Sequence, residues 1–156
     1  MSSTAIAALT SAGVPHQVVR HEPVRSLPEA ARALGIAVPD VVKTIVVRRS
    51  ADDFVFVLVP GDRVISWPKL RALLGVNRLS LPDADEARSV TGYERGTITP
   101  FGARTAWPVV ADERIRNRRI SLGAGERGVA ILLDADEAVR VLGATVADVT
   151  DPERPR

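Results

Sequence analysis

Residues 44–59, TIVVRRSADDFVFVLV, constrain the fold more than any other part of the chain. Two runs rich in β-branched and aromatic residues, 44–48 and 54–59, are separated by the polar turn Ser50-Ala51-Asp52-Asp53. This pattern predicts two strands joined in a hairpin. Because a hairpin pairs its strands in antiparallel fashion, the sheet that contains it is not purely parallel.

Helix signals and further strand-like runs surround the predicted hairpin. A helix is predicted where a Ser or Asp cap precedes an apolar run that a glycine closes, since glycine adopts the left-handed conformation that ends helices. Such helices are predicted at 26–34, 66–74, 83–91 and 134–142, and an N-terminal helix from about 3 to 12 also ends at a glycine. Further strands are predicted at 78–81, 109–111, 119–122 and 129–133.

The irregular alternation of these elements predicts an α/β fold: a single domain with a mixed sheet and helices packed around it. A chain of 156 residues is long enough for one domain that folds unaided. The domain is expected to span residues 1–150. Residues 151–156, DPERPR, are expected to form a flexible C-terminal tail.

Composition excludes several kinds of site. The chain has no cysteine and two histidines, His16 and His21, which excludes disulfides, thiolate zinc sites and a cysteine nucleophile. No run of alternating acids suggests a hard-cation site, so neither a metal nor a cofactor is expected. The first nineteen residues carry no charged side chain, but polar residues interrupt them. A signal peptide or membrane span is therefore not expected, and the protein is predicted to be cytoplasmic.

The segment at 91–102, TGYERGTITPFG, is the first candidate for a functional loop. It combines Gly92, Gly96 and Gly102 with Pro100, so it fits neither a helix interior nor a central strand. It also holds the only tyrosine of the chain. Its backbone can approach a ligand closely and direct N–H groups at it, and loops held between regular elements often carry function.

Lys43 is the second candidate. The chain has nineteen arginines but only two lysines, and Lys43 lies where an apolar strand begins. A lysine supplies a compact ammonium with three rotatable donors, which a planar guanidinium does not. The alternative interpretation, an edge-strand lysine that prevents aggregation or reaches into solvent, remains open at this point.

Two other motifs are given structural interpretations. Residues 123–128, GAGERG, match the GxGxxG pattern of dinucleotide-binding folds, but that fingerprint requires a following helix and the next residues, VAILL, predict a strand. A hairpin turn whose backbone can line a pocket is the simpler interpretation. His21, which precedes Glu22 and Pro23, is interpreted as a surface or structural residue.

Arginines are clustered in two places on a chain with a net charge of +2. Arg48 and Arg49 end one predicted strand, and a second cluster comprises Arg114, Arg116, Arg118 and Arg119. A solvated loop and a strand end are favoured over a nucleic-acid patch on this evidence.

Four features together resemble the YbaK/ProX family, the free-standing relatives of the editing domain inserted in bacterial prolyl-tRNA synthetases. They are the strand VVKTIVV around Lys43, the VPGD turn at 59–62, the loop GYERGTITPFG and the turn GAGERG. The GxxxP motif of the family falls on residues 96–100. The resemblance runs from about Ala5 to Val149 and so covers nearly the whole chain.

The resemblance implies a single α/β domain with a mixed, partly barrel-like sheet, and an aminoacyl-tRNA deacylase that acts chiefly on tRNA(Pro). Water attacks the ester in this family, without a metal or a protein nucleophile. We expect the Lys43 ammonium to hold oxygens of the terminal nucleotide, and an N–H group at Gly96 to stabilise the oxyanion. The expected substrate-binding residues are Tyr93, Thr97, Ile98, Thr99, Pro100, Phe101, Gly102, Gly123 and Gly125.

Three departures from the cysteine-removing branch bear on the substrate. In that branch of the family, we expect a tyrosine near the position of Val19, a serine at that of Gly123 and an aspartate at that of Ala130. The missing polar groups suggest a less polar pocket for another small amino acid such as alanine. A pocket that distinguishes amino acids by size alone would have broad specificity. They also leave open an alternative, a non-catalytic adaptor that binds tRNA or a synthetase. A prolyl-tRNA synthetase complex is a further suggested partner; the amino acid, the isoacceptor and the oligomeric state are not determined by the sequence.

Overall fold

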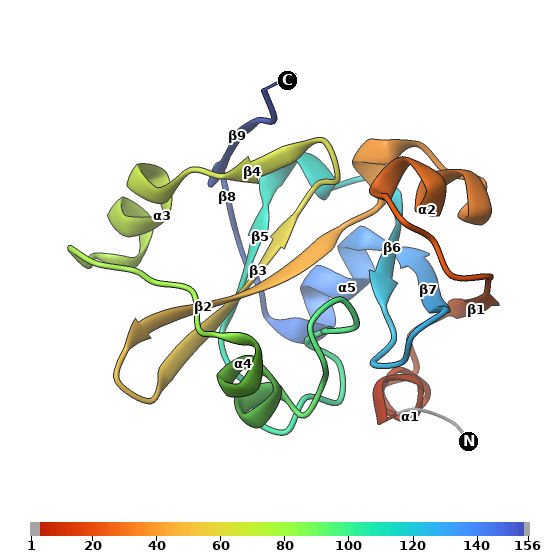
Figure 1. Ribbon diagram of the computed structural model, residues 1–156, viewed down its shortest axis with the longest axis horizontal. Helices are drawn as coiled ribbons and strands as arrows, with labels where there is room; N and C mark the ends of the chain where they lie inside the picture. Colours follow the sequence, from red (N-terminus) through yellow and green to blue (C-terminus); the bar gives the residue numbers. More distant parts are fainter. Residues whose placement is uncertain (1–3, 155–156) are drawn as a thin grey trace.

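The computed structural model describes residues 4–154, and its strands form three sheets (Figure 1). The first sheet has the order β1-β7-β6, the second β2-β3-β5-β8, and the third pairs β4 with β9. The strand bounds are β1 His16–Arg20, β2 Lys43–Ser50, β3 Asp53–Val59, β4 Arg63–Ile65, β5 Val109–Asp112, β6 Arg119–Gly123, β7 Val129–Asp134, β8 Thr145–Ala147 and β9 Thr150–Pro152.

The predicted hairpin and the mixed sheet are confirmed. β2 pairs with β3 in antiparallel register, whereas β3 with β5 and β5 with β8 are parallel pairs. The single α/β domain expected from the sequence is therefore present. Within residues 4–154 the strands do not close into a barrel, because they are divided among separate sheets.

The five predicted helices are confirmed, with caps at the expected residues. Ser26 accepts a hydrogen bond from the Glu29 N–H, and Gly35 follows in the left-handed conformation, with φ of 69°. The start predicted for the first helix at Ser3 lies outside the described residues. The bounds are α1 Thr4–Ser11, α2 Leu27–Leu34, α3 Trp67–Leu74, α4 Ala84–Thr91 and α5 Ala135–Leu142, with short 3-10 helices at Val38–Asp40 and Glu113–Ile115.

Several strand boundaries differ from the expectation. The strand predicted at 78–81 is wrong: Ser80 makes only an isolated bridge to Arg48, and no ladder extends from it. Four short strands, β1, β4, β8 and β9, were missed because runs of three to five residues carry little periodic signal. β9 also extends the ordered chain into the segment predicted as a tail, and the Glu153 N–H donates to the Asp62 carbonyl.

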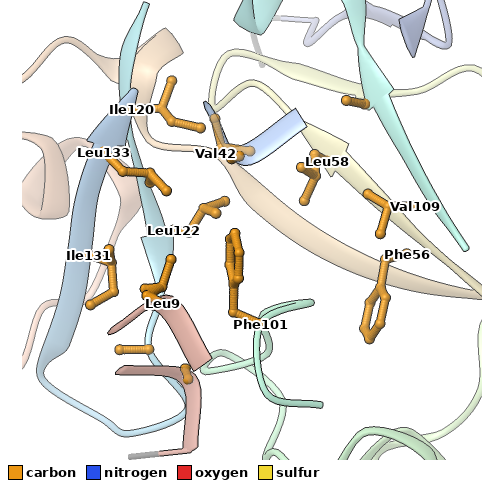
Figure 2. Packing of buried hydrophobic residues seen from close by; sticks show 14 of the residues in the cluster. Leu9, Val42, Phe56, Leu58, Phe101, Val109, Ile120, Leu122, Ile131 and Leu133 are labelled. Atoms are coloured by element: carbon orange, nitrogen blue, oxygen red, sulfur yellow. The ribbon is translucent and has the colours of Figure 1, made fainter. Parts of the chain in front are cut away.

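Two hydrophobic clusters lie on opposite faces of the second sheet. The larger fills the space between the first and second sheets, where Figure 2 shows Val42 and Leu58 facing Leu122 and Leu133. The smaller packs Val47 and its neighbours against α3. None of the helices within residues 4–154 has the length and apolar character needed to cross a bilayer.

Candidate active site

A cavity of about 650 Å³ lies where α2, the start of β2 and the sheet β1-β7-β6 meet. This volume is within the range of small-ligand sites. Four of the predicted site residues border it: Lys43, Gly96, Ile98 and Gly123. The remaining lining comes from His21, Pro23, Val24, Ala30, Leu34, Val41, Val42, Thr44, Ser121, Leu122, Glu126, Arg127, Gly128, Val129 and Ala130.

The three positions that depart from the cysteine-removing branch form one row across the first sheet. Ala130 of β7 pairs directly with Val19 of β1 on one side and with Gly123 of β6 on the other. Residues directly opposite one another in a ladder share a face of the sheet. Gly123 and Ala130 both line the cavity, so this part of its wall carries no polar side-chain group.

The functional loop enters the cavity only at Gly96 and Ile98. Gly96 has a φ of 91°, and a Cβ placed on it would meet nothing within 4 Å. Gly123 lies behind the loop, where a Cβ would come within 3.0 Å of the carbonyl oxygens of Thr97 and Ile98. The absence of a side chain at Gly123 therefore lets the loop lie directly on β6.

The other predicted substrate-binding residues of the loop lie away from the cavity, and most of them are packed into the protein. The Tyr93 hydroxyl donates to the Phe101 carbonyl at 2.7 Å and is 2.8 Å from the Thr4 hydroxyl. Burial raises the pKa of Tyr93, although its hydrogen bond with Thr4 opposes this. Gly125 lies under the Tyr93 ring, and its N–H donates to the Thr97 carbonyl. Tyr93 and Gly125 are therefore not part of the cavity lining. Among the other predicted residues, Thr97, Thr99, Pro100 and Phe101 are buried, and Gly102 lies against the α1 backbone.

Lys43 borders the cavity, but its ammonium is held on the side of β4. It donates a 2.7 Å hydrogen bond to the carbonyl oxygen of Arg63, which is not part of the lining. Burial lowers the pKa of Lys43, while the nearby carboxylates of Glu153 and Asp62 act in the opposite direction. Because an ammonium has three donors, two N–H groups remain for a ligand.

Sequence reasoning missed Thr44, which follows Lys43 and also lines the cavity. Its hydroxyl is the one buried side-chain polar atom within residues 4–154 that has no hydrogen-bond partner. Unpartnered buried hydroxyls are uncommon and require an explanation. The sequence could not have indicated a role for Thr44, because threonine is common in strands for structural reasons.

Charged side chains lie at the rim of the cavity. Arg127 is 75% exposed and its guanidinium lies 3.6 Å from the Glu94 carboxylate. His21, interpreted as structural from its sequence, lines the cavity, and its Nδ1 lies 2.8 Å from the Glu22 carbonyl oxygen. No group of three or more His, Cys, Asp or Glu side chains within residues 4–154 is arranged to hold a metal ion.

The turn GAGERG joins β6 to β7, which pair in antiparallel register. A strand follows the glycines, as the sequence predicted, so the helix that dinucleotide binding requires is missing. The backbone of this turn contributes Gly123 and Gly128 to the lining instead.

A mixed α/β domain in which a lysine and a glycine loop border a ligand-sized cavity is typical of small binding or hydrolytic domains. Within that class, residues 21–141 match the family model described as the aminoacyl-tRNA editing domain. The chain belongs to this family, which confirms the resemblance seen in its sequence.

Individual relatives agree with this assignment. A protein of Enterococcus faecalis, provisionally named Cys-tRNA(Pro)/Cys-tRNA(Cys) deacylase EbsC, is 26% identical over 129 residues, which are 82% of this chain and 79% of that protein. The proline–tRNA ligase of Thermosipho africanus is 36% identical over 93 residues, 60% of this chain. The match spans only 16% of that ligase.

A solved structure has the same fold over nearly its whole length. It is a crystal structure described provisionally as a trans-editing enzyme for prolyl-tRNA synthetase, with a TM-score of 0.88 and 27% sequence identity. The similarity covers 97% of this chain and 99% of that one.

Proposed function

We propose that this protein hydrolyses the ester of tRNA(Pro) that carries a small wrong amino acid, alanine or cysteine. The observation that carries the proposal is the cavity that joins Lys43 and Gly96 in a chain of the editing-domain family. The similarity to proteins named as a Cys-tRNA deacylase, a trans-editing enzyme and a proline–tRNA ligase supports tRNA(Pro) as the substrate. Such a substrate also favours a place in the cytoplasm and contact with a prolyl-tRNA synthetase.

The cavity wall favours a small, weakly polar amino acid. Ala130 and Gly123 offer no side-chain donor or acceptor, and the hydroxyls of the lining belong to Thr44 and Ser121. A wall of this kind discriminates mainly by size, and one methylene in an apolar pocket is worth only ~1–3 kcal/mol. We therefore expect alanyl-tRNA(Pro) to be removed readily and the cysteinyl form to be a weaker substrate.

The proposed reaction requires little chemistry from side chains. Water adds to the ester carbonyl carbon, the carbon–oxygen bond to the terminal ribose breaks, and the ribose hydroxyl leaves with a proton. An N–H group of the loop at Gly96, whose φ of 91° leaves open space beside it, stabilises the negative oxygen. The remaining N–H groups of Lys43 hold oxygens of the terminal nucleotide and orient the ester.

Thr44 is a further candidate for substrate contact in this scheme. Its buried hydroxyl has no partner in the described chain and lies on a residue that lines the cavity. A hydroxyl or amine of the substrate would supply the missing hydrogen bond.

The test is a deacylation assay with alanyl-, cysteinyl- and seryl-tRNA(Pro), comparing the wild type with Lys43→Ala. We expect hydrolysis of the alanyl form, and a loss of about 10² in rate in the variant, the size expected when a group that orients the substrate is lost. An unchanged rate in Lys43→Ala would exclude the role given to its ammonium. Exclusive activity on the cysteinyl form would exclude the size-based specificity.

A non-catalytic adaptor is the second candidate, because the row Val19, Ala130 and Gly123 lacks polar groups. It predicts binding of tRNA(Pro) with no hydrolysis of any of the three esters. The same assay, accompanied by a binding measurement with uncharged tRNA(Pro), therefore separates the two functions.

A further inference from the structure

A second cavity, of about 490 Å³, lies at the end of the β2–β3 hairpin. We call it the arginine cavity, because four of its nine lining residues are arginines and none is acidic. Its lining consists of Arg48, Arg49, Ser50, Ala51, Arg71, Asn77, Arg78, Leu79 and Ser80. The lining residues come from the β2–β3 hairpin, from α3 and from the segment that follows α3. Figure 1 shows the course of these three segments.

Two of the four arginines are fixed by contacts within the protein. The Arg49 guanidinium donates two hydrogen bonds to the Asp53 carboxylate, at 2.9 and 3.1 Å. Arg48 is paired with Glu86, donates to the Ser80 hydroxyl, and lies over the Phe54 ring at 5.7 Å. These contacts hold both guanidinium groups at the wall before any ligand arrives.

The other two arginines are not paired with an acid. Within residues 4–154, neither Arg71 nor Arg78 forms an ion pair, and Arg78 is exposed. Of the four arginines, Arg48 and Arg49 are thus paired with carboxylates of the described chain, whereas Arg71 and Arg78 are not. An excess of guanidinium groups in a hollow favours phosphate, because the planar fork of arginine binds phosphate oxygens in pairs.

The position of the arginine cavity relates it to the candidate active site. Lys43 begins β2 and borders the active-site cavity, whereas Arg48, Arg49 and Ser50 end the same strand. The six residue steps from Lys43 to Arg49 span about 20 Å, at ~3.3 Å per residue. By the ~3.4 Å axial spacing of phosphates on one strand of a duplex, that length corresponds to about six nucleotides.

The second arginine cluster of the sequence is a poorer phosphate site. Arg114 is paired with Asp112 and Asp148, Arg116 with Asp136, and Arg118 with Asp40. Arg119, the fourth member, has no carboxylate partner in the described chain and donates to the Gln17 side chain. Three of the four guanidinium groups of this cluster thus already have a carboxylate partner, compared with two of the four at the arginine cavity.

We propose that the arginine cavity binds backbone phosphates of the tRNA acceptor arm, about 20 Å along β2 from Lys43. The proposal rests on the proposed function for the identity of the RNA. In this proposal Arg71 and Arg78 contact the phosphates directly. Arg48 and Arg49, which are held by their ion pairs, form the wall beside them. Contacts of this kind position the substrate without reading its sequence.

The first test measures the binding of uncharged tRNA(Pro) at several salt concentrations. The double variant Arg71→Gln/Arg78→Gln is expected to reduce the slope of log Kd against log salt by about 1–2, since each lost phosphate contact reduces it by ~1. Arg71→Lys/Arg78→Lys keeps the charge and is expected to keep the slope. The matched control, Arg116→Gln/Arg140→Gln, removes two exposed charges near α5 and is expected to leave it unchanged.

The second test compares two substrates in the deacylation assay. The Gln double variant is expected to lose about 10-fold in kcat/KM on full-length aminoacyl-tRNA(Pro), given roughly 3-fold per contact. It should act like the wild type on an aminoacylated oligonucleotide of the last three nucleotides, which is too short to reach the hairpin. Circular dichroism and urea unfolding establish that the variant is folded.

The outcomes separate this proposal from the proposed function. A wild type that hydrolyses neither substrate overturns the proposed function, while the salt slope still decides whether the arginine cavity binds RNA. Hydrolysis with an unchanged slope and unchanged kcat/KM in the Gln double variant overturns the phosphate site. A reduced slope in the Arg116→Gln/Arg140→Gln control, with none in the test variant, also overturns it and favours the region around α5.

Discussion

The Lys43 ammonium lies 2.7 Å from the carbonyl oxygen of Arg63 and donates a hydrogen bond to it. The first residue of β2 is thereby connected to the short strand β4, outside the lining of the candidate active site. The catalytic candidate thus has a structural partner as well as a place at the cavity. Its charge therefore affects both stability and reactivity.

The pH dependence of stability tests the burial of Lys43. Burial lowers the pKa of Lys43 below the ordinary value of 10.5, so the unfolded chain binds the proton more tightly than the folded chain. Between the lowered pKa and 10.5 the unfolded state holds more protons, and the free energy of unfolding must rise with pH. We expect the stability of the wild type relative to Lys43→Met to increase as the pH rises from 7 to 10.5.

Urea unfolding of both proteins across this pH range makes the measurement. Subtracting the variant cancels the titration of the other groups that the two proteins share. A difference that stays constant, or falls as the pH rises, would contradict the lowered pKa.

The Thr44 hydroxyl provides a stability test without charge. Since this hydroxyl is buried with no hydrogen-bond partner in the described chain, replacing it by a methyl group removes a desolvation penalty. Thr44→Val is expected to increase the free energy of unfolding by about 1 kcal/mol. Under the proposed function the same variant should hydrolyse aminoacyl-tRNA more slowly, because the substrate loses a partner.

Thr91→Val is the matched control for this substitution. The buried Thr91 hydroxyl donates to the Ala87 carbonyl at 2.7 Å and accepts from the Tyr93 N–H at 3.1 Å. Its removal should destabilise the protein by about 1–2 kcal/mol. If both variants lost stability equally, the Thr44 hydroxyl would have a partner.

Two glycines with positive φ should respond differently to alanine. Gly125 has a φ of 78°, and a Cβ there would lie 2.4 Å from the Tyr93 ring. Gly125→Ala therefore adds a steric clash to the ~1–2 kcal/mol of left-handed strain, whereas Gly96→Ala has the strain and open space. Thermal unfolding should show a clearly larger loss for Gly125→Ala, and equal losses would show that the ring moves aside freely.

Asp112 should be the most sensitive carboxylate of the chain. It is fully buried and accepts hydrogen bonds from the Thr150 hydroxyl at 2.8 Å, the Val149 N–H at 3.2 Å and Arg114 at 3.1 and 3.2 Å. Asp112→Ala leaves the buried Val149 N–H and Thr150 hydroxyl without this acceptor, while the Arg114 guanidinium keeps Asp148, so we expect a loss of about 3 kcal/mol in urea unfolding. Glu137→Ala, which removes an exposed pair with Arg140, should cost less than ~0.5 kcal/mol.

The helices and the hairpin could be predicted because their signals are local. Ser26 with Glu29 and Gly35 define both ends of α2 within ten residues of chain. The helices α3, α4 and α5 likewise begin after a capping Ser or Asp and end at a glycine. The short strands could not be predicted in this way. β9 is a strand because Asp151 meets Val64 of β4, a pairing between residues far apart in the chain.

The candidate site shows the same difference between local sequence signals and long-range contacts. Lys43 and the glycine loop could be singled out as candidates, and the resemblance to editing domains recognised, from the sequence, because motifs and their spacing lie in neighbouring positions. Contacts between distant segments place Gly96 at the cavity with Tyr93 packed behind it, bond Lys43 to Arg63, and leave Arg71 and Arg78 without a carboxylate in the part of the chain that the structure describes. These relationships depend on contacts between distant segments, whose register and distance no local pattern specifies.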